Sequence, residues 1–139
     1  MFKTAEEVKA DRKNRLSGQA HQELDRAITR IRRTDHLDHD GASWHVHEDA
    51  RQTIQDYAAR AALNGKSAKL RDAENSKHEL DKEQLSDLVD AATEWLEELR
   101  DAADTIRSNI DSADAENLQA LLDALKSVET KSALKDLAD

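Results

Sequence analysis

Histidines and acidic residues gather in the stretch 34–47, and their types and spacing are those that metal chemistry would need. Imidazole nitrogens bind zinc and nickel, and a His-x-His pair on one face of a strand can chelate one ion. A plainer interpretation is a solvated acidic loop that responds to pH through its histidines, and we favour it because such spacing arises easily in a polar loop. We expect no metal site, with four weak candidates: His36, His39, His45 and His47.

Three arginines at positions i, i+4 and i+7 of an expected helix form a second candidate set. Arg26, Arg30 and Arg33 would share one side of that helix, where their guanidinium groups could meet phosphates or a row of carboxylates. No aromatic residues are interleaved with them, and the acidic remainder of the chain would repel nucleic acid. We therefore expect this side of the helix to bind a protein partner.

No catalytic constellation is visible in the sequence. Carboxylates are abundant, but none stands beside a nucleophile or in a glycine-rich turn, and neither of the phosphate-binding patterns GxGxxG and GxxxxGK occurs. The chain has no cysteine, which excludes disulfides, thiolate catalysis and cysteine-bound metals. We therefore expect that the protein is not an enzyme and has no cofactor.

The longest helical pattern, over residues 81–113, has apolar residues at alternating intervals of three and four. Asp81 followed by Gln84 predicts a capping box at its start. At roughly 1.5 Å per residue, such a helix would be about 48 Å long, which exceeds the width of a compact domain of this size. We therefore expect part of its apolar stripe to lie against another chain.

A basic helical arm is predicted over residues 1–33. Thr4 and Glu7 have the spacing of a capping box, and Gly18 predicts a kink, because glycine weakens a helix. This arm has nine Lys and Arg against five Asp and Glu, whereas residues 34–139 have twelve against twenty-five, and together these give the net charge of −9. The asymmetry predicts that the arm lies on an acidic body, within one chain or between neighbours.

The middle of the chain, residues 34–114, combines helices with extended segments. Gly41 marks a turn, and the alternation that follows predicts a short extended segment with Trp44 and Val46 directed inward. Asp49 with Gln52 predicts the start of a helix.

This helix is expected to run to about Asn64, with Gly65 after its end. Residues 67–80 then predict a small β-hairpin with its turn at residues 72–75.

A leucine-rich stripe predicts a C-terminal helix over residues 115–139, with a weak point near Thr130. Its leucines either join the core or pair between chains, and the partner-binding candidates among them are Leu118, Leu122 and Leu125. The core itself must be thin, because aromatic residues make up 3% of the chain and charged residues 37%. We expect the following side chains in it: Trp44, Val46, Ile54, Tyr57, Leu85, Leu88, Trp95, Leu99, Ile106 and Ile110.

Four motifs follow one another in a fixed order between residues 44 and 114. They are Trp44-His45-Val46-His47-Glu48-Asp49-Ala50-Arg51-Gln52-Thr53-Ile54, Arg71-Asp72-Ala73-Glu74-Asn75, Leu80-Asp81-Lys82-Glu83-Gln84-Leu85 and Ile110-Asp111-Ser112-Ala113. In their order and spacing, they resemble a helical domain of unknown function that is common in bacteriophage tail proteins and tail-fibre assembly proteins. The chain departs from that family at Leu70, where tryptophan is usual, and at Glu74, where aspartate is usual.

The patterns and the resemblance together give one expected fold and one expected function. The fold is mainly α, an elongated helical bundle or helical hairpin with a small β-hairpin between helices. The resemblance implies a phage or prophage tail accessory protein, either a virion component or a tail-fibre assembly factor, that acts by helix-mediated binding and forms a homo-oligomer.

The expected location is the virion tail or the bacterial host cytoplasm, since no apolar run approaches the length that crosses a bilayer. The alternative function is an acidic inhibitor or DNA mimic that binds a host nucleic-acid-binding protein, and it rests on the excess of carboxylates after residue 33.

Overall fold

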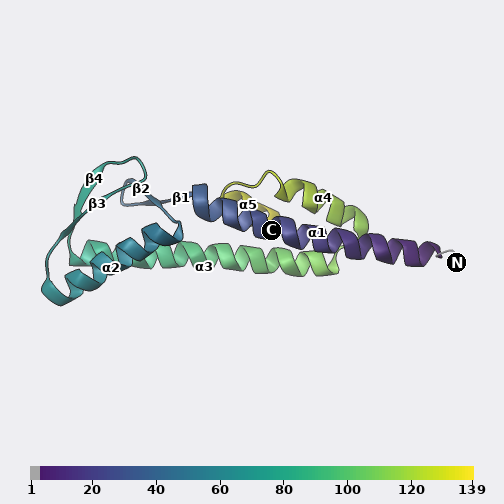
Figure 1. The fold of residues 1–139 in the computed structure, drawn as a ribbon, viewed down its shortest axis with the longest axis horizontal. Coiled ribbons are helices and arrows are strands. Elements are labelled where there is room, and N and C mark those ends of the chain that lie inside the picture. Colours follow the sequence, from purple (N-terminus) through teal and green to yellow (C-terminus); the bar gives the residue numbers. More distant parts are fainter. Residues whose placement is uncertain (1–3) are drawn as a thin grey trace. The chain divides into compact units, whose positions relative to one another are not determined.

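The computed structural model describes residues 4–139, and these form a mainly α fold with two small β-hairpins (Figure 1). The predicted fold class is therefore confirmed in its helical content and in the hairpin between helices. In chain order, the elements are α1 (Ala5–Thr34), β1 (His36–His39), β2 (Ala42–His45), α2 (Glu48–Asn64), β3 (Ala68–Arg71), β4 (Lys77–Leu80), α3 (Lys82–Ser112), α4 (Ala115–Leu125) and α5 (Lys131–Ala138).

Two compact units divide the chain, and both draw on α1 and α3. The helical unit contains the residues up to Ile31 together with Leu99–Asp139, and the hairpin unit contains Arg32–Glu98. Among the described residues, no helix is long and apolar enough to span a membrane.

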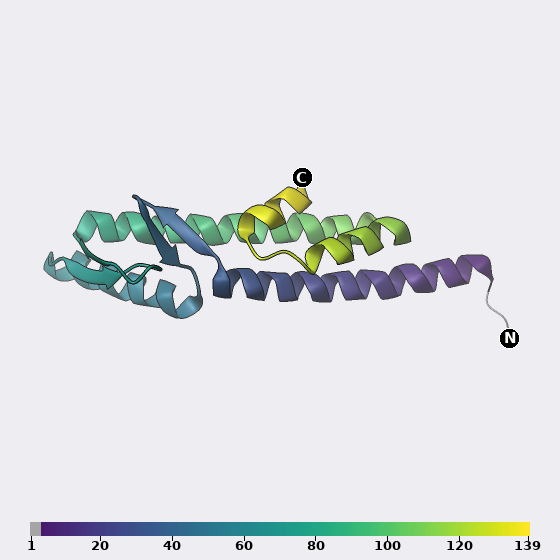
Figure 2. The same ribbon diagram turned by 90° about the horizontal axis from the view of Figure 1, so that it is seen from above.

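Both long helices begin at the capping boxes that the sequence predicts. At the start of α1, the Thr4 hydroxyl accepts a hydrogen bond from the Glu7 N–H at 3.1 Å, and the Glu7 carboxylate accepts one from the Thr4 N–H at 3.3 Å. Asp81 and Gln84 make the same reciprocal pair at α3, at 2.8 and 2.9 Å. Helix α1 continues through Gly18 without a break (Figure 2), since one glycine costs only about 1 kcal/mol in a helix.

The helical unit buries the apolar stripe of α1 together with leucines and isoleucines of α3, α4 and α5. A hydrogen bond and an ion pair join α1 to α3 at the edge of this core: His21 Nε2 lies 3.0 Å from Asp111 Oδ1, and Arg107 Nη2 lies 3.5 Å from Asp25 Oδ1. The largest fully buried side chains of this unit are Leu24, Ile31, Leu99, Ile106, Ile110, Leu118, Leu125 and Leu134.

Residues 115–139 form two helices rather than the single expected one. Asp114 caps α4 by accepting a hydrogen bond from the Asn117 N–H at 2.9 Å. Thr130 caps α5 in the same way, with its hydroxyl accepting from the Ala133 N–H at 3.1 Å. The weak point expected near Thr130 is thus a new helix start, because a threonine hydroxyl can take up an N–H that would otherwise lack a partner.

The hairpin unit contains two antiparallel hairpins, of which the sequence predicted one. The predicted hairpin pairs β3 with β4, with Ala68 opposite Leu80. The second pairs β1 with β2, with His36 opposite His45, so the extended segment expected at Trp44 has a partner strand that the sequence pattern did not reveal.

Helix α2 begins at Glu48, and its N-cap is His47 rather than the predicted Asp49. The His47 Nδ1 accepts a hydrogen bond from the Ala50 N–H at 3.1 Å, and this contact replaces the expected pairing of Asp49 with Gln52. The helix ends as predicted, with Gly65 in the left-handed conformation at φ 70°.

Trp44, Ile54, Leu70, Leu85 and Leu88 form the buried core of the hairpin unit together with Ala61. Tyr57 is only partly buried, whereas the other nine side chains that we expected in the core are 0–6% exposed. The apolar stripe of α3 is buried from Leu85 to Ile110, except for Val89, which is partly buried. The expectation that part of this stripe faces another chain is therefore wrong, because the chain covers it by itself.

Candidate functional site

The turn of the second hairpin is built around one buried carboxylate. Asp72, which is 7% exposed, accepts hydrogen bonds from the Glu74 and Ser76 N–H groups, both at 2.9 Å. Its other oxygen lies 2.7 Å from His78 Nε2. The hydrogen bond with His78, followed by that with the Ser76 N–H, holds the pKa of Asp72 below its ordinary value.

This turn also fastens the two hairpins to each other. The Ala73 N–H donates to the Ser43 carbonyl of β2 at 2.7 Å, and the rings of Trp44 and His78 lie 5.3 Å apart between their centroids. The Arg71 guanidinium closes the turn by donating to the Asn75 carbonyl at 2.9 Å. Residues of the motif Arg71–Asn75 therefore serve as the connection between the hairpins.

Three of the four candidate histidines form a row of rings on the first hairpin and the residues that follow it. Ring centroids are 5.3 Å apart for His36 and His45 and again for His45 and His47. Partial desolvation, and then the charges of His47 and His36, lower the pKa of His45.

His39 lies apart from this row, with Nε2 3.4 Å from Asp40 Oδ2. Within residues 4–139, no group of three or more His, Asp or Glu side chains is placed to hold a metal ion.

The three candidate arginines have different surroundings. Arg30 donates to the carbonyls of Leu125 and Val128 at 2.8–3.1 Å and lies 3.6 Å from the buried Glu23 carboxylate, so it caps the end of α4. Arg26 is exposed and pairs with Glu23 at 3.2 Å. Arg33 is exposed. We expected the three arginines to form one binding side of the helix. Arg30 is not available for it, because its guanidinium donates to carbonyls at the end of α4.

The candidate leucines of α4 belong to the core of the helical unit. Leu118 and Leu125 are 0% exposed, and Leu122 is 6% exposed. They offer no apolar surface to a partner, because other side chains of the same unit cover them. The core interpretation of these leucines is the one that the structure supports.

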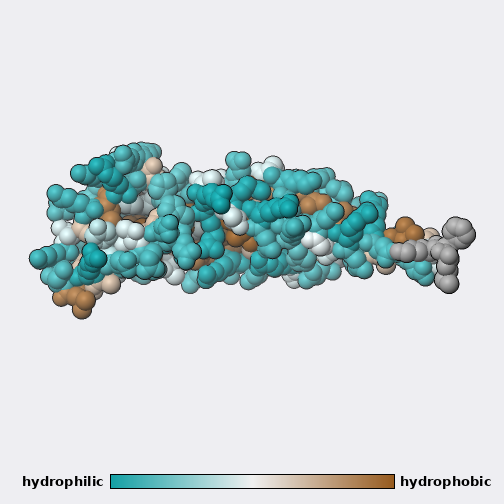
Figure 3. Space-filling view, in the orientation of Figure 1, coloured by the Kyte–Doolittle hydropathy of each residue, from teal (hydrophilic) through white to brown (hydrophobic). Residues whose placement is uncertain are grey.

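Exposed apolar surface is scarce, and the face in Figure 3 is largely hydrophilic. Among the described residues, the large hydrophobic side chains that are exposed are Val8 on α1, at 53%, and Leu63 in the last turn of α2, at 90%.

Beside the end of α2 lies a hollow of about 480 Å³, which has a rim of basic side chains. The Arg60 guanidinium lies 5.6 Å from the centre of the Tyr57 ring on that rim. The hollow is lined by Tyr57, Arg60, Ala61, Asn64, Lys66, Ser67, Ala68, Lys69 and Glu79.

A second hollow, of about 340 Å³, lies between the hairpins and the start of α3. Trp44 and His39 are among its lining residues. Among the described residues, Trp44 Nε1 and His39 Nε2 are buried without a hydrogen bond, although His39 Nε2 has the Asp40 carboxylate 3.4 Å away. Lys77 and His78 complete its polar wall. Sequence reasoning missed both hollows, because their walls come from segments that only the pairing of the strands brings together.

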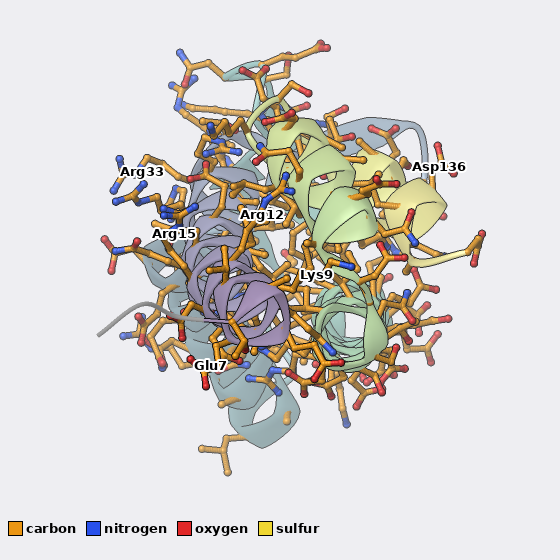
Figure 4. All side chains as sticks on the ribbon, turned by 90° about the vertical axis from the view of Figure 1, so that its right-hand side faces the viewer. Glu7, Lys9, Arg12, Arg15, Arg33 and Asp136 are labelled. Atoms are coloured by element: carbon orange, nitrogen blue, oxygen red, sulfur yellow. The ribbon has the colours of Figure 1, made fainter. Side chains whose placement is uncertain are left out.

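The long helices carry exposed rows of charge. Asp87, Asp90, Glu94 and Glu97 of α3 are all exposed and recur at intervals of three and four, which places them on one side of the helix. We call these four residues the acidic row. Figure 4 looks at the N-terminal end of α1, with Arg15 to the left of the helix, Arg12 nearer to α4 in the view and Asp136 of α5 at the right. Arg12 and Arg15 are both exposed.

Comparison with known families gives one match. Residues 3–127 match the family described as Domain of unknown function (DUF4376). The chain belongs to this family. Searches of the curated proteins and of the solved structures found no match.

The DUF4376 match is longer than the stretch that carries the resemblance noted in the sequence. It extends from the four motifs of residues 44–114 to α1 and α4, and it ends before α5. The match therefore covers the hairpin unit and most of the helical unit, including the buried leucines of α4 and the arginines of α1.

Proposed function

We propose that the protein is a tail accessory protein of a bacteriophage or prophage, and that it binds other tail proteins as a virion component or a tail-fibre assembly factor. Support comes from the motif order between residues 44 and 114, which resembles tail and tail-fibre assembly proteins. Further support comes from the role of the motif residues: Asp72 holds the turn of the second hairpin, and the Ala73 N–H joins that turn to the first hairpin.

The observation that carries the proposal is Leu63, a leucine 90% exposed in the last turn of α2, the helix whose end also lines the hollow. An isolated exposed leucine needs no explanation, but this one lies on the same helix end as a recess lined by three basic side chains. Arg60, Lys66 and Lys69 outweigh Glu79 around the recess. The surface suits a tail-protein segment that combines an apolar anchor with acidic residues.

Purification of particles and tail-fibre complexes from producing bacteria, followed by mass spectrometry, tests the proposal. The expected result is that the wild-type chain accompanies one of them. Leu63→Asp should lower recovery at least about tenfold, because it places a charge where an apolar anchor binds. The matched control is Gln55→Asp, at another exposed position of α2, which should leave recovery unchanged.

Absence of the protein from both particles and fibre complexes would contradict the proposal. Equal recovery of Leu63→Asp and the wild type would instead show that the surface at the end of α2 does not bind the tail proteins. Because Leu63 makes little contact with the rest of the chain, its substitution should change the free energy of unfolding by no more than about 0.5 kcal/mol, and a loss of binding would not reflect unfolding.

An acidic inhibitor or DNA mimic is the second candidate, and the acidic row of α3 is the observation that favours it. A line of carboxylates at regular spacing can occupy the phosphate-binding groove of a nucleic-acid-binding protein. Affinity capture from host cells distinguishes the two functions. Recovery of a nuclease or polymerase, lost in Asp90→Lys/Glu94→Lys, would favour the mimic over the tail protein.

A further inference from the structure

Helix α1 has an exposed row of donors outside its buried stripe. Positions 12, 15, 19, 22 and 26 recur at intervals of three and four, and all five side chains are exposed. We call these residues the basic row: Arg12, Arg15, Gln19, Gln22 and Arg26. Every member can donate hydrogen bonds to a carboxylate, and none carries a negative charge.

The acidic row of α3 has the same spacing and the opposite chemistry. Its four exposed carboxylates can each accept hydrogen bonds. Of the basic row, Arg26 pairs with Glu23 yet keeps 62% of its side chain exposed. Two helical rows with equal spacing can match over several turns, because in each the partners recur once per turn.

We propose that the basic row of one copy binds the acidic row of a second copy. Arginine and carboxylate form short, charge-assisted hydrogen bonds, and the two glutamines add neutral donors along the same line. A second copy is the occupant that the chain itself specifies, because it presents carboxylates at the required intervals. Nucleic acid is disfavoured as the occupant, because the net charge is −9 and no aromatic side chain lies in the row.

Such a contact should be cumulative and sensitive to salt. Each exposed pair is weak by itself, and ions screen charges beyond a Debye length of about 8 Å at physiological ionic strength. Several pairs in register are therefore needed. The proposal does not depend on the proposed tail function, since it concerns the chain with itself.

Sedimentation velocity of the full-length protein over a range of concentrations measures this self-association. Association is expected at 50 mM NaCl and should weaken at least about tenfold at 500 mM NaCl. Arg12→Glu/Arg15→Glu should abolish it, and so should Asp90→Lys/Glu94→Lys. Mixing the two variants should restore association, because each reversed row then meets a row of opposite sign.

The matched control is Lys9→Glu/Lys13→Glu, which makes the same change of net charge on the same helix at exposed positions outside the row. Lys9 lies on a different side of α1 from Arg15 (Figure 4). The control should associate like the wild type, and circular dichroism should give equal helicity for all variants.

Three results would overturn the proposal. These are a monomer at every concentration in low salt, equal loss of association in the control, and failure of the mixed variants to associate. Duplex DNA of mixed sequence is added as a separate probe. Binding of this DNA that Arg12→Glu/Arg15→Glu removes, with self-association unchanged, would assign the basic row to nucleic acid instead.

Discussion

The two hairpins have the same length and the same antiparallel pairing, but their turns are stabilised in different ways. In the first, Asp40 and Gly41 have φ angles of 50° and 78°, so the turn depends on residues that can adopt a positive φ. In the second, the Asp72 carboxylate accepts two backbone hydrogen bonds and one from His78. The first turn should therefore be sensitive to its glycine, and the second to one side chain.

Replacing Asp72 by alanine should have the largest effect on stability. The change leaves the Glu74 N–H, the Ser76 N–H and His78 without their acceptor in a half-buried turn, and it loosens the contact of Ala73 with Ser43. We expect the hairpin unit to melt at a clearly lower temperature. Hydrogen exchange of the β3 and β4 amides should accelerate roughly tenfold or more.

Asp38→Ala is the control for this effect, because Asp38 is an exposed aspartate of the first hairpin. Its carboxylate accepts a hydrogen bond from the Ser43 hydroxyl at 2.6 Å in contact with solvent. Its removal should change the free energy of unfolding by no more than about 0.5 kcal/mol. Equal effects of the two substitutions would show that burial of Asp72 does not distinguish the hairpins.

Gly41→Ala should have the next largest effect. An added Cβ meets nothing within 4 Å, so the cost comes from the backbone alone. For an L-residue at positive φ this cost is about 1–2 kcal/mol. Denaturant unfolding measures it, and the loss should be confined to the amides of β1 and β2 in hydrogen exchange.

Gly18→Ala should change the free energy of unfolding in the opposite direction. Gly18 lies inside α1 with open space around its Cα, and alanine there should stabilise the helix by about 1 kcal/mol. If Gly41→Ala were also stabilising, the first turn would not depend on its positive φ.

Local signals explain which elements the sequence could predict. The starts of α1 and α3 follow from reciprocal capping pairs three residues apart, and the end of α2 follows from Gly65. These features depend on neighbours in sequence. In contrast, β1 contains one apolar residue, Leu37, and it becomes a strand only because the turn at Gly41 folds it onto β2.

The candidate sites depend on contacts that no local pattern contains. The segment around Asp72 has the composition of an ordinary polar turn. The burial of Asp72 depends on the β3–β4 register, which brings His78 to it. The cap of α2 was misassigned because histidine is a rarer N-cap than aspartate, and the backbone before Glu48 made His47 the residue in position. Burial of Leu118 follows from how α4 folds onto its unit, which periodicity leaves open.

Acidification should destabilise the two hairpins at different pH values, and this is the smallest of the predicted effects on stability. Both lowered pKa values act in the same direction, since the unfolded chain binds protons more readily than the folded one. The stability that His45 contributes is complete above its ordinary pKa of 6.5. It is lost as the pH falls through the lower pKa of the folded state. For Asp72, the loss begins only near 3.8. Protection factors of the β1–β2 amides, which correct the exchange rate for its intrinsic dependence on pH, should therefore fall between pH 8 and 5 before those of the β3–β4 amides. His45→Gln should reduce this early fall, because it removes the imidazole whose pKa the fold lowers.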